Sequence, residues 1–203
     1  MGQVESAGKN TKINRLWWRI THCEERFVGR KCLVASGDHR SIDINPVIDR
    51  LSIGWCLVDK NGLTVSAMRN DHPPVVDSYA LRFDAGGKSI TFSGDTRYLP
   101  SLAGFAKNSD VLVHEAMLVK GVDYVLAKTK TGDDRLKNHL LAAHSFAEQA
   151  GQIAASADVG HLVLNHLIPP ERHICNDADW QAETRRSFDG RCSVGHDGMA
   201  IEF

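Results

Sequence analysis

The sequence predicts an α/β fold in which a mixed β-sheet carries helices on one face. Strand-like segments come first and are joined by tight turns, as in antiparallel hairpins. Further along the chain, short apolar runs alternate with segments of helical periodicity, as in parallel sheets. A chain of 203 residues, of which 42% are hydrophobic, is long enough to bury one sizeable core.

Two hairpins account for the first part of the predicted sheet. Residues 55–58 and 63–68 flank an Asn-Gly dipeptide, which two-residue hairpin turns favour. Residues 78–83 and 89–92 flank a second turn that ends in two glycines. Each pair of segments therefore predicts two neighbouring antiparallel strands.

The rest of the chain predicts helices that alternate with buried strands. Apolar runs predict strands at 111–113 and 162–164, and we expect helices at 99–106 and 177–186. Two short strands around Asp197-Gly198 are expected to close the chain.

A further helix is expected to begin after Ser145. Ser145-x-x-Glu148 fits a capping box. An apolar stripe follows at helical spacing, made of Phe146, Ala150, Ile153, Ala154 and Ala157. Residues 120–138 show little pattern, and they predict a mobile loop beside a site.

Bulk properties exclude several classes of protein. A net charge of −1 gives no sign of a membrane-surface or polyanion-binding patch. Five cysteines without C-x-x-C spacing indicate free thiols in a reducing compartment. Residues 1–20 lack the apolar stretch of a signal peptide, and no run is long enough to span a membrane. We therefore expect a cytoplasmic location and no membrane partner.

The domain organisation is uneven. Residues 1–50 show no sustained period of two or 3.6 residues, and we interpret them as a poorly patterned N-terminal remnant. Residues 51–203 carry the predicted elements and form the main domain.

Three residues with metal-binding side chains stand where predicted strands give way to loops. His72 opens a loop whose two prolines restrict the backbone. Asp95 follows an apolar run inside Ser93-Gly94-Asp95-Thr96, and His166 leaves the strand at 162–164. Strand ends are where a rigid sheet aims such ligands. Singly, each has an ordinary alternative, namely a turn histidine or an aspartate cap.

Two further polar residues, His144 and Glu115, lie beside predicted elements. His144 directly precedes the predicted helix, whose N-terminus lowers the pKa of an imidazole. To act as an acid it therefore needs a carboxylate partner, and Glu115 is the candidate. The alternative is that His114-Glu115 forms a buried structural pair. We interpret the remaining histidines as bystanders, structural or surface residues: His22, His139, His161, His173 and His196.

The ordered set H…SGDT…HE…HS…H resembles the C-terminal half of a metallo-β-lactamase-fold hydrolase of the ribonuclease Z and arylsulfatase-like group. His114-Glu115-Ala116-Met117 is similar to the family's H-E-A-T segment, without the threonine, and His144-Ser145-Phe146 to its H-S-T segment. The resemblance implies the C-terminal half of an αββα sandwich.

The same resemblance implies roles for the residues. His72, Asp95 and His166 are expected to bind metal, with Asp95 bridging two ions. His144 and Glu115 are expected to be catalytic. One or two zinc ions are implied, and manganese or iron takes the same kinds of ligand.

The family's first metal-binding motif, H-x-H-x-D-H, is not present in the sequence. Residues 34–39 keep only Asp38-His39, and we interpret this match as coincidental. Two hypotheses follow. The chain is a metal-dependent hydrolase of a phosphodiester, sulfate ester or similar ester, or it is a truncated, non-catalytic half-domain that lacks a complete metal site.

The expected partners follow from the same comparison. The last motif, Asn165-His166-Leu167-Ile168-Pro169, lacks the basic and aromatic continuation expected for tRNA processing. We therefore expect a small-molecule ester as the substrate rather than tRNA. A missing half would leave one face of the sheet uncovered, and this predicts self-association as a homodimer.

Overall fold

The computed structural model describes residues 32–33, 41–42, 55–129 and 134–203. The chain divides into two compact units at Leu51/Ser52, with Glu202 as the single residue grouped with the first unit from beyond that boundary. In the first unit, β1 (Cys32–Leu33) and β2 (Ser41–Ile42) pair in antiparallel fashion. The rest of the predicted remnant at 1–50, including His22 and Asp38-His39, lies outside the described residues.

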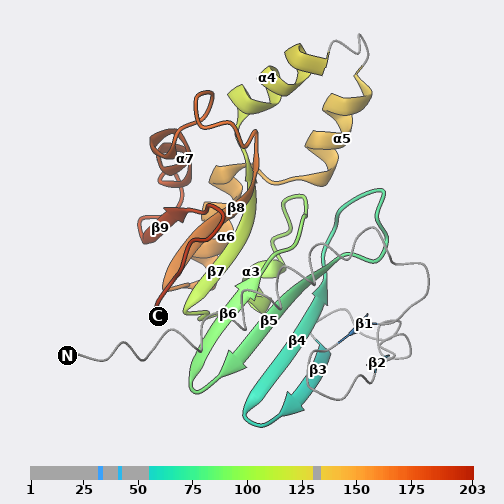
Figure 1. The fold of residues 1–203 in the computed structure, drawn as a ribbon, viewed down its shortest axis with the longest axis vertical. Coiled ribbons are helices and arrows are strands. Elements are labelled where there is room, and N and C mark those ends of the chain that lie inside the picture. The colour runs from blue at the N-terminus through green and yellow to red at the C-terminus, as the bar shows by residue number, and fades with distance from the viewer. Residues whose placement is uncertain (1–31, 34–40, 43–54, 130–133) are drawn as a thin grey trace, which may run out of the picture. The chain divides into compact units, whose positions relative to one another are not determined.

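The second unit is built on a seven-stranded sheet in which the strands follow one another in chain order (Figure 1). Its strands are β3 (Trp55–Lys60), β4 (Leu63–Arg69), β5 (Tyr79–Ala85), β6 (Lys88–Phe92), β7 (Val111–Met117), β8 (His161–Ile168) and β9 (Arg191–Val194). Strands β3 to β6 pair in antiparallel fashion, and β6 to β9 in parallel. The two predicted hairpins and the mixed sheet are confirmed.

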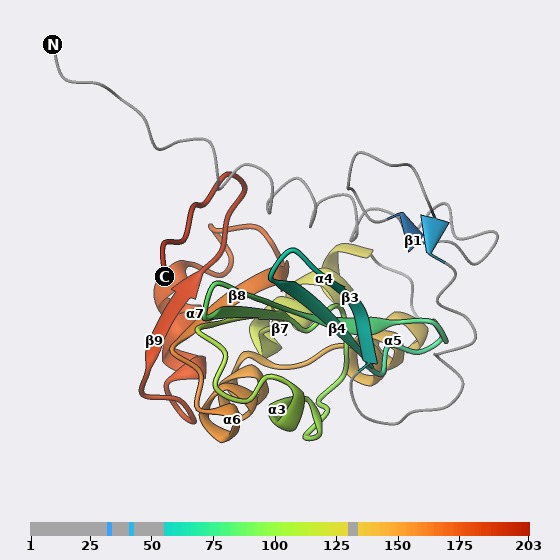
Figure 2. The same cartoon turned by 90° about the horizontal axis from the view of Figure 1, so that it is seen from below.

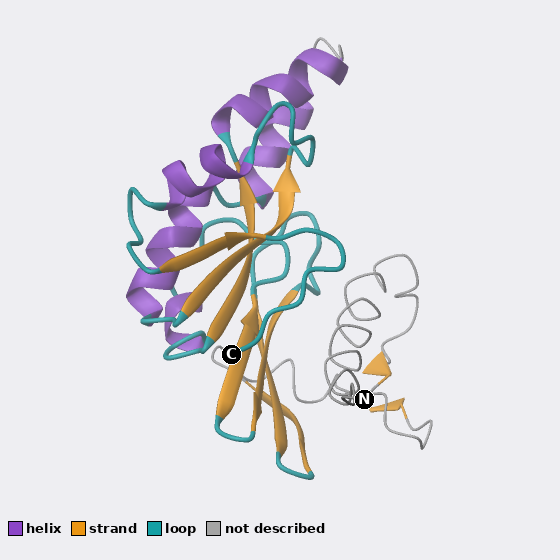
Figure 3. Cartoon of the chain, turned by 60° about the vertical axis from the view of Figure 1, so that its left-hand side comes forward, coloured by secondary structure: helices purple, strands orange, loops and turns teal. Residues whose placement is uncertain are grey.

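Helices gather on one side of the sheet, as Figure 3 shows, which confirms the predicted arrangement. They are α3 (Leu102–Phe105), α4 (Val119–Thr129), α5 (Arg135–Ala143), α6 (Ala147–Ala157) and α7 (Asp177–Thr184). Figure 2 shows α3, α6 and α7 beneath the sheet. Helices α4 and α5 extend as a pair beyond the end of β7 (Figure 1).

The main core lies between the sheet and its helices. Leu112 and Leu164 of the central strands are fully buried with Ile153 of α6 and Trp180 of α7. Burying a side chain of this size contributes about 2 kcal/mol. Every residue of β7 is buried, as expected of a central strand in a parallel sheet. The packed core therefore fixes the parallel strands whose ends carry the candidate residues.

The prediction of a mobile loop at 120–138 was wrong. Most of that segment lies in α4 and α5, with 130–133 outside the described residues. Val122 and Leu140, one from each helix, pack with Met117 at the end of β7. Val122, Val125 and Leu126 recur at helical spacing and pack in this same cluster, so the sequence held a helical pattern that the prediction missed.

Two local predictions also need correction. The capping box of α6 is not made by Ser145, because Phe146 occupies the cap position and its backbone N–H donates to Gln149 Oε1 at 2.8 Å. Ser145 Oγ instead donates to the Thr96 carbonyl at 2.7 Å. The C-terminal strands reduce to β9, and residues 195–203 contain no strand.

Across the helices that the structure describes, none combines the length and apolar character needed to cross a membrane.

Candidate active site

The candidate residues meet at one edge of the sheet. Because β4 and β6 each pair in antiparallel fashion with β5, they run in the same direction, and β7 and β8 run parallel to β6. The carboxyl ends of these four strands therefore lie along the same edge. His72 follows β4, Asp95 follows β6, Glu115 lies near the end of β7, and His166 lies near the end of β8.

Asp95 and His166 form an ion pair across this edge. Their Oδ2 and Nε2 atoms are 3.5 Å apart, and the His166 side chain is 47% exposed. Gly94 makes the approach possible, since its φ is +61° and a Cβ there would lie 2.7 Å from the Tyr79 carbonyl oxygen. A residue with a side chain would push the Asp95 loop away from β5.

His166 is held in an unusual backbone conformation. Its φ is +41°, in the left-handed region that residues other than glycine rarely adopt. At this point β8 carries one extra residue, because Glu115 pairs with Asn165 and Ala116 with Leu167. This β-bulge turns the His166 side chain out of the sheet, as bulges beside active sites commonly do.

Glu115 and His144 form a buried pair. His144 Nδ1 lies 3.2 Å from both carboxylate oxygens, and the side chains are 1% and 6% exposed, respectively. The Thr96 backbone N–H donates to Glu115 Oε1 at 2.8 Å. Ser145, the residue after His144, donates a hydrogen bond from its Oγ to the carbonyl of the same Thr96. The pair is thus fixed to the loop that carries Asp95.

Burial shifts the pKa values of the two groups in opposite directions. Burial raises the pKa of Glu115 well above its ordinary value, and the nearby charge of Asp95 acts in the same direction. Burial lowers the pKa of His144. Both effects favour a protonated Glu115 that donates to Nδ1 of a neutral His144. His144 then carries its own hydrogen on Nε2, the nitrogen that faces away from Glu115.

His72 lies against the same group. Its Nδ1–H donates to the Ala143 carbonyl at 3.0 Å, which leaves Nε2 with a free lone pair. Its ring centroid is 5.0 Å from that of His144, whose ring stacks at 5.5 Å on His166. The structure therefore brings all five predicted site residues together, while their roles stay predictions.

His114 and His161 do not join this group. His114 is fully buried, and its Nδ1–H donates to the Glu115 carbonyl at 2.7 Å. Burial lowers the pKa of His114 to about 4, so the ring is neutral at physiological pH. His161 lies at the opposite end of β8, 2.9 Å from Ser193 Oγ. Two more histidines were predicted to be structural or surface residues: His173 contacts the Tyr124 ring, and His196 is exposed.

His139 was placed with the surface residues by the sequence, yet it lies beside the site. Its ring centroid is 6.2 Å from that of His72 and 6.1 Å from that of His144. No motif contains it. Its position five residues before His144 would have been a usable signal only if a helix had been assigned at 135–143.

The donor types suit a borderline metal such as zinc, but the site is incomplete in the described part of the chain. A ring nitrogen bound to a carbonyl, as in His72, is the usual support for a metal-binding imidazole. In residues 55–129 and 134–203, however, no three His, Cys, Asp or Glu side chains converge closely enough to hold an ion. The described residues therefore supply candidate ligands but not a complete set.

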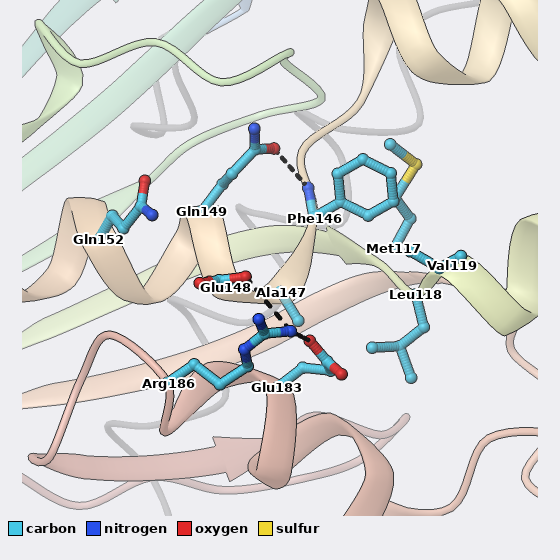
Figure 4. Close-up of a pocket in the computed structure, with 10 residues that line it drawn as sticks. All are labelled: Met117, Leu118, Val119, Phe146, Ala147, Glu148, Gln149, Gln152, Glu183 and Arg186. Atoms are coloured by element: carbon cyan, nitrogen blue, oxygen red, sulfur yellow. Dashed lines mark hydrogen bonds and ion pairs between the residues drawn. The ribbon is translucent and has the colours of Figure 1, made fainter.

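A separate pocket lies between β7, α6 and α7 (Figure 4). Its wall includes Arg186, which lies 3.1 Å from Glu183 and 3.6 Å from Glu148. Among its described lining residues there is no histidine or cysteine, and its arginine is held by the two glutamates, so we do not treat this pocket as the candidate active site.

Comparisons with known proteins bear on the fold and on the family. Two solved structures superpose on the chain: the metallo-β-lactamase-fold protein YhfI from Bacillus subtilis (23% identity, TM-score 0.54, 71% of this chain and 52% of that one) and Zn²⁺-bound PqqB from Methylobacterium extorquens (16% identity, TM-score 0.53, 75% and 51%). The described part of the chain thus has the metallo-β-lactamase fold, as the sequence predicted. No protein-family model matches the chain.

Sequence similarity narrows the group. Ribonuclease Z of Mycobacterium tuberculosis H37Rv is 31% identical over 147 residues, which cover 71% of this chain and 50% of that protein. Over this part the chain belongs to the ribonuclease Z-like group of metallo-β-lactamase-fold proteins. It spans between 49% and 61% of the length of the curated relatives it matches.

The expected substrate needs correction. The prediction that a small-molecule ester is preferred over tRNA is contradicted, because the curated relatives are named as ribonucleases. The absence of a basic and aromatic continuation after His166 was therefore a poor guide, since residues far apart in the sequence can supply the contacts to a nucleic acid.

Proposed function

We propose that the chain carries catalytic residues of a metal-dependent phosphodiester hydrolase that acts on RNA of the tRNA class. The observation that supports this most directly is the pairing of Glu115 with His144 beside the Asp95–His166 ion pair. A proton-transfer pair next to candidate metal ligands is the arrangement that phosphodiester hydrolysis requires. Similarity to ribonuclease Z favours this hypothesis over the non-catalytic half-domain.

In this proposal, His72, Asp95 and His166 help to hold the metal. Zinc is proposed because the ligands are imidazole and carboxylate. When bound, such an ion supplies a hydroxide at neutral pH. His72 is positioned for this by its hydrogen bond to Ala143, and His166 by the β-bulge.

His144 is the proposed proton donor to the leaving oxygen. It releases the hydrogen on Nε2, while Glu115 passes its own proton to Nδ1. The product is a neutral His144 beside an ionised Glu115, so one proton has left the pair. Because burial raises the pKa of Glu115, the carboxyl group keeps its proton until the imidazole takes it up.

The test is cleavage of a precursor tRNA transcript by the full chain with added zinc or manganese, alongside elemental analysis. We expect cleavage in the presence of metal and none in EDTA. We also expect weak zinc binding, far below two ions per chain, because three candidate ligands do not complete a two-metal site. Absence of cleavage with either metal would overturn the proposed function. Two tightly held ions would mean that other residues complete the site.

A further inference from the structure

We propose that His139 contacts the substrate, donating a hydrogen bond to a phosphate oxygen of bound RNA. The starting observation is its position. The edge of its ring meets both His72 and His144, with centroid distances of 6.2 and 6.1 Å. It therefore belongs to the group of four imidazoles that includes His166. This inference rests on the proposed function, because it takes the ligand to be RNA.

The position of His139 is fixed by the packing of α5. Leu140, the next residue, is buried against Met117 and Val122. One turn after His139, the Ala143 carbonyl accepts a hydrogen bond from His72. The helix then ends at His144, whose backbone N–H donates to the Leu140 carbonyl. An exposed histidine on a helix is ordinarily a surface residue. The turn that follows His139, however, is held in place by the burial of Leu140 and by the hydrogen bond between His72 and the Ala143 carbonyl.

The ring nitrogens of His139 are available to a ligand. Each of the other three imidazoles has a nitrogen engaged: His72 with Ala143, His144 with Glu115, and His166 with Asp95. Across the part of the chain that the structure describes, no hydrogen bond or ion pair to His139 is found, and the residue is exposed. A neutral imidazole always carries one N–H, so the ring can donate in either protonation state.

Phosphate is the ligand chemistry that this donor fits. Non-bridging phosphate oxygens only accept hydrogen bonds, whereas Asp95, the partly exposed carboxylate of the site, offers only acceptors to an incoming RNA. The arginines beside the ligand-carrying loops are already paired, Arg69 with Asp77 and Arg97 with Asp71. An unpaired donor at the rim therefore supplies what the carboxylates lack, and phosphate contacts set the register of a nucleic acid on a protein.

Binding and cleavage of a precursor tRNA transcript test the proposal in two separate measurements. Binding is followed by fluorescence anisotropy in EDTA, so that it does not depend on activity. We expect His139→Ala to weaken binding by about tenfold. In cleavage, KM rises by a similar factor while kcat changes little, because the contact is made in the ground state and the transition state alike. His139→Gln retains an N–H donor and should recover part of the loss.

Two matched variants serve as controls. His173→Ala removes another exposed histidine that contacts an aromatic ring, and Asn138→Ala alters the neighbouring position of α5. Both should bind the transcript as the unchanged chain does, with the same thermal unfolding midpoint as His139→Ala. Normal binding by His139→Ala, equal losses in the controls, or no binding by the unchanged chain would overturn the proposal. Binding that depends on His139 in a chain unable to cleave would refute the proposed function alone.

Discussion

The two edges of the parallel sheet use similar residues in opposite ways. At the amino ends of the strands, Asp110 accepts hydrogen bonds from Lys88 Nζ at 2.9 Å and from the Ser89 backbone at 2.8 Å. These donors lower the pKa of Asp110, and the hydrogen bond from Lys88 has the largest effect. At the carboxyl ends, Asp95 has its ion pair with His166 at 3.5 Å, which is longer than a good hydrogen bond.

The difference indicates which of the two carboxylates can still bind a ligand or take part in proton transfer. A carboxylate saturated with short hydrogen bonds is fixed in one ionisation state and stabilises the fold. Asp95 makes only a long contact, and it lies beside a buried pair in which the pKa of Glu115 is raised and that of His144 is lowered. Such a carboxylate can still bind a ligand or a proton. Substitutions at the two edges of the sheet test this contrast, and the largest expected effect is at Asp95.

Asp95→Ala and Asp110→Ala should separate function from stability. If Asp95 bridges metal ions, its removal should abolish metal binding and RNA cleavage together, with little change in the free energy of unfolding. Asp110→Ala should keep both activities and lower the free energy of unfolding by about 1 kcal/mol, because partly exposed ionic hydrogen bonds contribute modestly. Elemental analysis, cleavage and urea unfolding measure these quantities. Retained metal in Asp95→Ala would remove it from the ligand set.

His144→Ala should lower turnover by about 10²–10⁴-fold while metal content stays unchanged, because a proton donor is lost and no ligand is. The loss should shrink for model phosphodiesters with good leaving groups, which need no protonation. His161→Ala changes the other edge, where the ring bonds to Ser193, and should leave turnover intact. Equal losses for good and poor leaving groups would show that the acid has been misassigned.

His114 should make the fold sensitive to acid. Its folded pKa of about 4 lies below the unfolded value of 6.5, so protonation favours the unfolded chain. The stability it contributes is complete above pH 6.5 and is lost as the pH falls towards 4, by about 3 kcal/mol in all. His114→Gln should lack this dependence. Urea unfolding of both chains between pH 7 and 4 measures the difference, in which the opposite contribution of Glu115 cancels. Parallel curves would contradict the assignment.

The smallest expected effect concerns the backbone at His166. At a φ of +41°, glycine should be more stable than alanine by about 1 kcal/mol. Thermal unfolding of His166→Gly and His166→Ala compares the two. The same pair of substitutions at Thr64, inside β4, should show the reverse order, since glycine weakens an ordinary strand. A more stable His166→Ala chain would mean that the bulge is not strained.

The expectations of a homodimer and of a cytoplasmic location stay predictions, as do the roles of His72, Asp95, Glu115, His144 and His166. The proposed boundary between a remnant at 1–50 and a domain at 51–203 also stays a prediction.

The hairpins were readable from the sequence because their signals are local. An Asn-Gly turn between residues 55–58 and 63–68 specifies its own hairpin, which β3 and β4 confirm. Apolar runs at 111–113 and 162–164 likewise predicted the first halves of β7 and β8. By contrast, the helical spacing of Val122, Val125 and Leu126 in α4 was missed, because charged residues and a glycine interrupt that segment.

By itself, the sequence determined the order of the strands and the loops after β4 and β6 that carry His72 and Asp95, because turns and apolar runs act over a few positions. It ended β7 and β8 too early, since Glu115 and His166 lie within those strands. Tertiary structure alone decided that His166 is the extra residue of a bulge, since that depends on the register of β8 against β7. It also decided that Glu115 is buried against His144, twenty-nine residues away, and that His139 joins the site. Such contacts depend on packing between elements distant in the chain, which no local pattern encodes.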